Sequence, residues 1–200
     1  ETDYELRSIA NTLGAPSDSV YLRENATESK VKSLELSQSR ILAFATHGLV
    51  SGEIKGVAEP ALVLTPPEVG TEKDDGLLTA SEVAQLKLDA DWVILSACNT
   101  ASSDGEPGAE GLSGLARSFF YAGARSLLVS HWPVETNSAV EITTGIFEEM
   151  KTNPEIGRSE ALRRSRKRMI NHQTNPEYAH PFYWAPFVVV GEGGHINIKK

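Results

Sequence analysis

Short, mainly apolar runs recur along this chain and predict buried strands, because a strand covered on both faces shows no polar alternation. The candidate strands cover residues 19–22, 41–46, 61–64, 92–96, 126–130 and 186–191. Between several of them, apolar residues recur at the i, i+3, i+4 spacing of a helix with one buried stripe. The candidate helices cover residues 4–13, 28–36, 79–86, 112–122, 139–150 and 158–171. This alternation predicts an α/β domain with a mostly parallel sheet that is covered by helices on both faces.

Local signals mark the ends of several of these helices. Thr27 stands where it can cap the second helix, and Thr79 and Glu82 have the spacing of a capping box. Gly14 and Gly123 each follow an apolar stripe, so we expect a helix to end before each of them.

The length and composition suit one domain with a full core. The chain has 200 residues, of which 40% are apolar and 23% charged. Residues 48–78 are rich in glycine, proline and charge and predict an insertion with a hairpin over 57–64, while residues 192–200 predict a flexible tail. Because the chain starts at Glu1 rather than at methionine, we expect a piece of a longer polypeptide.

The charge excludes some classes of partner. The net charge of −8 argues against nucleic-acid binding, which relies on a basic surface. No apolar run approaches the roughly 20 residues of a membrane span, and no signal-peptide pattern is present. We therefore expect a cytoplasmic protein with no membrane partner. The single cysteine cannot form an internal disulfide, which agrees with a reducing compartment.

A histidine and the only cysteine stand where two buried strands are predicted to end. His47 follows the run at 41–46, and Cys98 follows the run at 92–96. If these strands are parallel neighbours, both side chains emerge at the carboxyl edge of the sheet, where open α/β folds place their active sites. An imidazole can activate a thiol near neutral pH. The backbone N–H of Gly48, paired with that of Cys98, would form an oxyanion hole for acyl transfer.

Structural roles remain open for the same residues. Cysteine is among the most buried residue types, so Cys98 alone also fits a small apolar filler, and His47 alone fits a hydrogen-bonded strand end. His131 competes as the base because it too follows a predicted strand, but the adjacent Trp132 indicates a pocket wall. The histidines and the cysteine lack metal-ligand spacing, and no phosphate-binding glycine loop or nucleophilic-serine elbow is present. No metal or other cofactor is therefore expected.

Two charged segments need separate interpretations. Residues 158–168 are strongly basic, but an inward stripe on the same predicted helix indicates a solvated outer face rather than a nucleic-acid site. This stripe consists of Ala161, Leu162, Ser165 and Met169.

The loop after Cys98 carries Asp104, Glu106 and Glu110. Loop carboxylates are ordinarily just solvated, yet these three lie close enough to Cys98 to select a basic substrate side chain. The candidate substrate pocket thus comprises Asp104, Glu106, Glu110, His131 and Trp132.

Several short segments, taken in order, resemble one known family. They cover residues 44–48, 95–100, 110–119, 122–126, 132–134 and 180–187. Together they resemble the CHAT domain, a caspase-like module of bacterial and some eukaryotic proteins, over about residues 6–191. The resemblance implies a caspase-like three-layer α/β/α sandwich with a mostly parallel sheet. It also implies a protease dyad in which Cys98 attacks the peptide carbonyl, His47 protonates the leaving amine, and the N–H groups of Gly48 and Cys98 hold the oxyanion.

This chain departs from the family pattern in two respects, and one position differs from metacaspases. Caspase-like folds usually start with a central strand before the first helix, and this chain starts at that helix. We expect the missing strand to come from the longer polypeptide, or the sheet to close differently. CHAT domains often follow TPR-like helical repeats, which are absent here and are expected partners within the parent chain. Ser96 stands where metacaspases carry aspartate, so a Lys or Arg preference rests on the acidic loop alone.

The leading hypothesis is a caspase-like cysteine endopeptidase that cleaves a protein substrate in a bacterial signalling or stress pathway. The alternative is a CHAT-fold interaction module that keeps the dyad residues but does not cleave. A small-molecule cysteine hydrolase that uses the same dyad is a weaker third hypothesis. The presence of His47, Gly48 and Cys98 together favours the peptidase.

Overall fold

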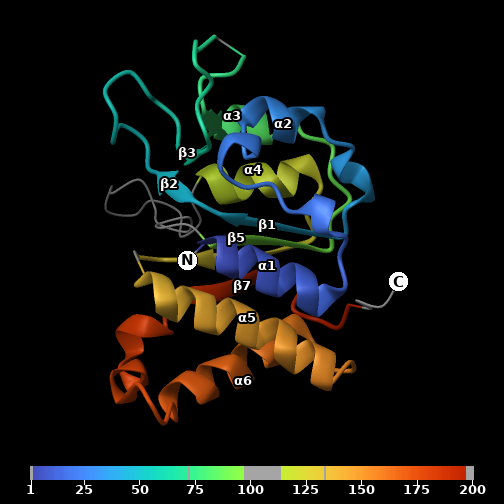
Figure 1. Ribbon diagram of the computed structural model, residues 1–200, viewed down its shortest axis with the longest axis vertical. Helices are drawn as coiled ribbons and strands as arrows, with labels where there is room; N and C mark the ends of the chain where they lie inside the picture. Colours follow the sequence, from blue (N-terminus) through green and yellow to red (C-terminus); the bar gives the residue numbers. More distant parts are fainter. Residues whose placement is uncertain (1, 72, 97–113, 133, 197–200) are drawn as a thin grey trace. The chain divides into compact units, whose positions relative to one another are not determined.

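The computed structural model describes residues 2–71, 73–96, 114–132 and 134–196 (Figure 1). The chain forms two compact units. One unit is Tyr21–Pro133, and the other combines Glu1–Val20 with Val134–Lys200. Buried apolar side chains occur in both, so each unit has a core of its own.

The unit Tyr21–Pro133 contains a parallel sheet. Its central strand β5 (Trp92–Ser96) lies between β1 (Ile41–Ala45) and β6 (Ser126–Ser130). β1 pairs with β5 residue by residue, from Ile41 opposite Trp92 to Ala45 opposite Ser96. Parallel neighbours need long crossover connections, which here contain helices. The predicted mixed α/β fold with a mostly parallel sheet is confirmed.

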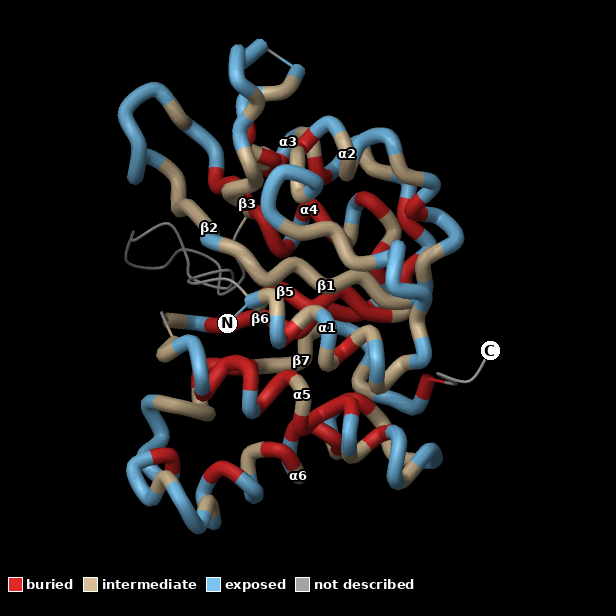
Figure 2. Tube along the Cα trace, in the orientation of Figure 1, coloured by how far each residue is buried: buried red, intermediate tan, exposed pale blue. Residues whose placement is uncertain are grey.

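The strands of this sheet differ in burial (Figure 2). Four residues of β5 and all of β6 are buried, whereas every residue of β1 is half-buried. Among the described residues, β5 is the one strand that pairs with β1. β1 is therefore an outer strand of the sheet, and no described strand precedes it in the chain.

Helix α4 (Gly114–Ala122) packs an apolar stripe against this sheet. The ring centroid of Phe119 lies 5.6 Å from that of Phe44 in β1, and Phe119 is fully buried. The predicted stripe is confirmed for the residues that the structure describes. Leu112, its first predicted member, lies outside them.

A small antiparallel sheet occupies part of the predicted insertion. β3 (Ala61–Val63) lies between β2 (His47–Leu49) and β4 (Leu77–Thr79). The predicted strand at 61–64 is thus correct, but the hairpin expected within 57–64 is wrong. Eight residues are too few for two strands and a turn, and the partners of β3 come instead from segments before and after it.

Two short helices of this unit begin at the predicted caps. The backbone N–H of Lys30 donates to the Thr27 hydroxyl (3.1 Å) at the start of α2 (Glu28–Ser33). The carboxylate of Glu82 accepts from the Thr79 N–H (2.9 Å) at the start of α3 (Ala80–Val83). Both helices end earlier than predicted, because a bend follows Ser33 and a turn follows Val83, so the local fold overrides helix propensity.

One predicted strand is absent. Ser19 ends a 3₁₀ turn (Ser17–Ser19) and a second one begins at Arg23, which leaves three residues between two turns where the strand at 19–22 was expected. The other 3₁₀ turns are Arg23–Asn25, Leu36–Gln38, Pro176–Ala179 and Pro181–Tyr183.

The unit that contains both termini is mainly helical. Its elements are α1 (Thr2–Leu13), α5 (Thr136–Thr152), α6 (Arg158–Ile170) and β7 (Phe187–Gly191). Within it, the Thr143 hydroxyl donates to the buried carboxylate of Glu5 (2.8 Å), which joins α5 to α1. Gly145 allows close contact between α5 and α6, since a Cβ there would lie 2.6 Å from the hydroxyl oxygen of Ser165.

Helix α6 buries the predicted stripe and one of its cations, and it half-buries a second cation. The buried stripe consists of Ala161, Leu162, Ser165 and Met169. Arg158 is 1% exposed and lies 3.7 Å (Nη2–Oε2) from Glu192. Arg166 donates to the carbonyl oxygen of Phe187, and burial lowers the pKa of this guanidinium. The expectation that all cations of α6 face solvent is therefore wrong, because backbone and carboxylate acceptors are available inside the unit.

The end of α4 gives a first testable prediction. Gly123 has a φ of +114°, and a Cβ there would lie 2.2 Å from the carbonyl oxygen of Leu88. We expect Gly123→Ala to lower the free energy of unfolding by about 2–4 kcal/mol, because it adds backbone strain to a steric clash. Gly52→Ala is the control, since Gly52 also has a positive φ but has nothing within 4 Å, and it should cost about 1 kcal/mol. Urea unfolding of both variants tests this, and equal losses would contradict it.

Candidate active site

β1 and β5 end side by side at one edge of the parallel sheet. Ala45 and Ser96 are their last paired residues, and both strands run toward this carboxyl edge. His47 lies two residues beyond Ala45. Cys98 is two residues beyond Ser96 in the sequence but lies outside the described residues. The predicted parallel pairing of the two strands that lead to His47 and Cys98 is confirmed.

The chain passes from one sheet to the other at a single residue (Figure 1). β1 ends at Ala45, Thr46 forms a bend, and His47 begins β2. The hydroxyl of Thr46 donates a hydrogen bond to the carbonyl oxygen of Val63, which is also the residue of β3 paired with His47. His47 itself is exposed. Its backbone is thus held in a sheet while its side chain is open to solvent.

Gly48 is the next residue of β2. It is half-buried and pairs with Leu62, whose side chain is fully buried. A glycine in a paired strand has a defined backbone direction and no side chain to block the approach of a ligand. Gly48 therefore offers a close approach to its backbone directly beside His47.

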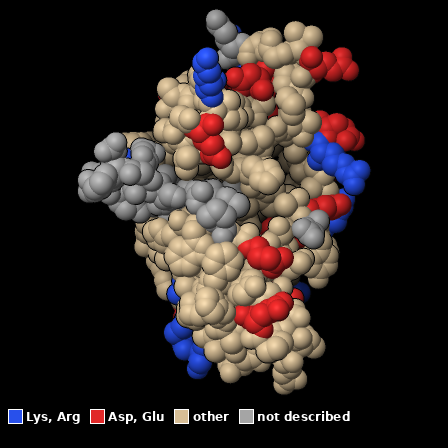
Figure 3. All heavy atoms as spheres, turned by 90° about the vertical axis from the view of Figure 1, so that its left-hand side faces the viewer, with Lys and Arg blue, Asp and Glu red and all other residues tan. Residues whose placement is uncertain are grey.

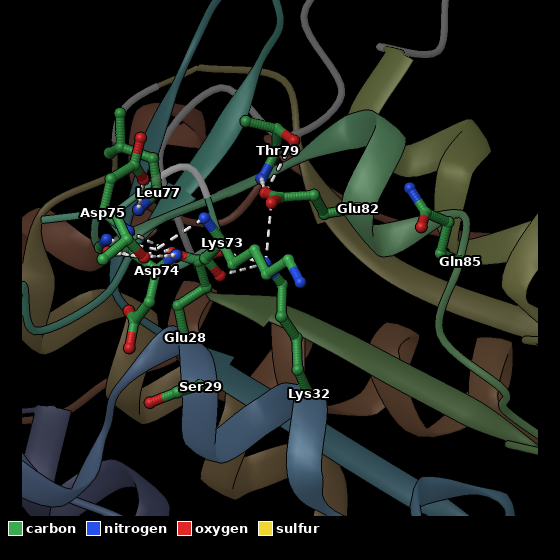
Figure 4. Close-up of polar contacts among 12 residues, drawn as sticks. Glu28, Ser29, Lys32, Lys73, Asp74, Asp75, Leu77, Thr79, Glu82 and Gln85 are labelled. Atoms are coloured by element: carbon green, nitrogen blue, oxygen red, sulfur yellow. Dashed lines mark hydrogen bonds and ion pairs between the residues drawn. The ribbon is translucent and has the colours of Figure 1, made fainter.

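Glu28 is a buried carboxylate that holds the turn leading into β4 (Figure 4). It is 1% exposed and accepts hydrogen bonds from the backbone N–H groups of Asp75 (2.9 Å) and Gly76 (3.0 Å) and from the ammonium group of Lys32. The carbonyl oxygen of Gly76 in turn accepts from the Leu64 N–H (2.8 Å), directly after β3. Glu28 thus connects α2 to the hairpin of β3 and β4.

Lys32 joins this carboxylate to a second one, forming the Glu28–Lys32–Glu82 cluster. Its ammonium group lies 2.7 Å from Glu82 Oε1 and donates to the carbonyl oxygen of Lys73 (2.9 Å). Burial lowers the pKa of Lys32, but its hydrogen bonds to Glu28 and Glu82 outweigh burial and raise it overall. Burial likewise raises the pKa of Glu82, but hydrogen bonds from Lys32 and Thr79 outweigh it and lower that pKa overall.

The other predicted site residues are only partly described. His131 directly follows β6 and is exposed, and Trp132 is half-buried. The pairing of Ile94 with Leu128 shows that β6 runs parallel to β5, so His131 also follows the carboxyl end of a strand. The acidic candidates Asp104, Glu106 and Glu110 lie outside the described residues.

The remaining histidines have local structural contacts. Nδ1 of His172 accepts from the Asn175 N–H (3.0 Å), and its ring meets that of Tyr178 edge-on. Nδ1 of His180 accepts from the Phe182 N–H (3.2 Å). These two histidines therefore stabilise turns of the terminal unit.

Other features of the described surface lie apart from the strand ends that lead to His47 and Cys98. No group of three or more His, Cys, Asp or Glu residues in the described part of the chain could hold a metal ion. A hollow of about 580 Å³ lies on α5 and α6, lined by Glu149, Arg163, Arg164, Lys167, Arg168 and Asn171, and belongs to the unit without His47. On the face drawn in Figure 3, Lys and Arg side chains are interspersed with Asp and Glu. None of the helices within the described ranges has the length and apolar character that crossing a membrane requires.

Sequence reasoning missed Thr46 and the Glu28–Lys32–Glu82 cluster. The apolar run at 41–46 predicts a strand that ends at Thr46, and its hydrophobic pattern does not indicate that the chain changes sheet there. Glu28 and Lys32 have i, i+4 spacing, which is the one local signal for this ion pair. The partners at Asp75 and Gly76 are backbone groups, which leave no mark in the sequence.

Comparison with known proteins identifies relatives over most of the chain. A family model described as the CHAT domain matches residues 1–192. The chain is also 28% identical over 206 residues to tetratricopeptide repeat protein 28 of Mus musculus and, at the same identity, to that of Homo sapiens. Each alignment covers 86% of this chain but 8% of the relative, so the chain spans a small part of the length of these proteins.

The lowered pKa of Glu82 predicts how stability changes with pH. A carboxyl whose pKa is lower in the folded state stabilises the protein above its unfolded pKa, and this stabilisation is lost as the pH falls through the folded pKa. Lys32, with its raised pKa, stays charged throughout this range. The wild type should therefore lose about 1 kcal/mol more of its free energy of unfolding between pH 7 and pH 3 than Glu82→Gln does.

Urea unfolding at both pH values measures this difference. Glu68→Gln is the control, because Glu68 is exposed, and it should follow the wild type. An equal loss in the wild type and in Glu82→Gln would contradict the role assigned to the Lys32–Glu82 pair.

Proposed function

The chain belongs to the CHAT domain family, which is caspase-like and related to peptidases, and we propose that it is a cysteine endopeptidase domain. The proposal assigns Cys98 as the nucleophile and His47 as the acid–base group. The observation that carries it is the in-register parallel pairing of Ala45 with Ser96. His47 and Cys98 each follow this pair by two residues in the sequence, so each comes directly after the carboxyl end of one of two neighbouring parallel strands.

The reaction that these residues would perform is acyl transfer followed by hydrolysis. His47 takes the proton from the Cys98 thiol, and the thiolate attacks the carbonyl carbon of the scissile peptide bond. The Sγ–C bond forms, the C–N bond breaks, and the leaving amine receives the proton from His47. Water, activated by His47, then attacks the thioester, the Sγ–C bond breaks, and the free carboxyl product leaves. In this scheme the backbone N–H groups of Gly48 and Cys98 stabilise the oxyanion.

The position of His47 in the structure supports this assignment. The imidazole is exposed, so a polypeptide substrate can reach it, and its backbone is fixed by pairing with Val63. Gly48 beside it adds no side chain that would block a substrate carbonyl. The single cysteine favours a reducing compartment such as the cytoplasm, where a catalytic thiol stays free.

The proposal extends to the substrate and to partners within the parent chain. His131 follows β6 at the carboxyl end of the strand, and with Trp132 it would form one wall of the substrate pocket. Asp104, Glu106 and Glu110 would favour a Lys or Arg side chain before the scissile bond. The relatives are named as tetratricopeptide repeat proteins, which supports TPR-like repeats as partners of this domain in a longer polypeptide.

Labelling with an acyloxymethyl ketone that carries Lys or Arg at P1 tests the dyad. We expect the wild type to be labelled at Cys98, and Cys98→Ala to remain unlabelled. In His47→Ala the labelling rate should fall about a hundredfold or more, because the base that activates the thiol is lost. His195→Ala is the matched control, an exposed histidine outside the proposed site, and should react like the wild type.

Equal labelling of the wild type and His47→Ala would overturn the dyad. Absence of labelling and of peptide cleavage, both in this chain and in the longer polypeptide, would favour a CHAT-fold interaction module that does not cleave. A probe with Asp at P1 that reacts as fast as the Lys or Arg probe would remove the acidic loop residues from the substrate pocket.

A further inference from the structure

The position of His47 depends on one bend between two sheets. Ala45 is the last residue of β1 in the parallel sheet, and His47 is the first residue of β2 in the antiparallel sheet. Thr46 is the single residue between them. The backbone dihedral angles at Thr46 therefore decide where His47 stands relative to the end of β1.

A side-chain hydrogen bond secures this bend. The half-buried hydroxyl of Thr46 donates to the carbonyl oxygen of Val63 in β3. Val63 is the same residue that pairs with His47 across the two strands. The hydroxyl thus connects the bend to β3, the strand that pairs with the backbone of His47.

The imidazole of His47 has no hydrogen-bond partner of its own among the described residues. Catalytic histidines are usually oriented by a partner on the second ring nitrogen. Within the described residues, the backbone at the bend therefore sets where the Cα of His47 lies, and the imidazole is displaced with it.

We propose that Thr46 is a positioning residue, whose hydroxyl fixes the bend that places His47 for its role as acid–base group in the proposed reaction. This proposal rests on the proposed function. It differs from a purely structural role for Thr46, in which the hydroxyl would only satisfy the Val63 carbonyl and would add stability without affecting the thiol.

The test compares variants that keep or remove the hydroxyl. Thr46→Val keeps the shape and the β-branch but removes the donor, whereas Thr46→Ser keeps the donor. Thr65→Val is the matched control, because the Thr65 hydroxyl, two residues after Val63, also donates to a backbone carbonyl, but to that of Arg23 (2.6 Å) rather than to β2 or β3. His47→Ala and the wild type set the two limits.

The measurement is the rate of Cys98 alkylation by iodoacetamide as a function of pH, with urea unfolding recorded for each variant. An imidazolium beside the thiol lowers the pKa of that thiol, so in the wild type alkylation should persist below the ordinary range of a free cysteine. Thr46→Val should move the midpoint toward that of His47→Ala and slow alkylation at neutral pH roughly tenfold. Thr46→Ser should restore the wild-type profile, and Thr65→Val should leave it unchanged.

Each outcome decides between the two proposals. If His47→Ala leaves the wild-type profile in place, the proposed function fails, and the role of Thr46 in that reaction fails with it. If His47→Ala moves the profile but Thr46→Val does not, the dyad stands and the positioning role of Thr46 is wrong. A profile that shifts equally in Thr46→Val and Thr65→Val would show a general loss of structure rather than positioning.

Discussion

The in-register parallel pairing of β1 with β5 is the constraint on which the candidate site depends. Side chains alternate between the two faces of a strand, so a slip of one residue would send every side chain of β1 to the opposite face. β5 resists such a slip, because its residues from Trp92 to Leu95 are fully buried on both faces, and exchanging side chains of different size between the two faces would disrupt close packing. The pairing of Ala45 with Ser96 is thereby fixed, and His47 and Cys98 each follow this pair by two residues in the sequence.

A second constraint acts where the chain leaves the parallel sheet. The small sheet of β2, β3 and β4 is held on the side of β2 by the hydroxyl of Thr46 and at the start of β4 by the carboxylate of Glu28. Both contacts reach the end of β3. The Leu64 N–H donates to the carbonyl oxygen of Gly76, and the Thr46 hydroxyl donates to the carbonyl oxygen of the adjacent Val63. The backbone of His47 is therefore supported by contacts that reach from β1 to α2.

The strands and helices that are determined by apolar burial could be predicted from the sequence, whereas features that depend on single polar contacts could not. β5 and β6 were predictable because their apolar runs require cover on both faces, and α5 because its stripe repeats over several turns. β2 and β4 have three residues each, too few to show a period, and their pairing depends on segments distant in the chain. For the candidate site, the edge position of His47 was predictable from the end of a buried run. The bend at Thr46 was not, because a threonine at a strand end has the same local pattern whether the chain continues or turns.

The Glu28–Lys32–Glu82 cluster shows why a buried charge is retained beside this site. Replacing a buried ion pair by apolar side chains is often neutral for stability, so the ion pair by itself does not explain Glu28. The N–H groups of Asp75 and Gly76 do, because both donate to this carboxylate and an apolar side chain at position 28 would leave them without an acceptor. The same turn requires glycine at position 76, since Gly76 has a φ of +89° and a Cβ there would lie 2.8 Å from Cα of Pro66. Glu28 supplies the acceptor for this turn, and Lys32 offsets the charge that the acceptor brings into the interior.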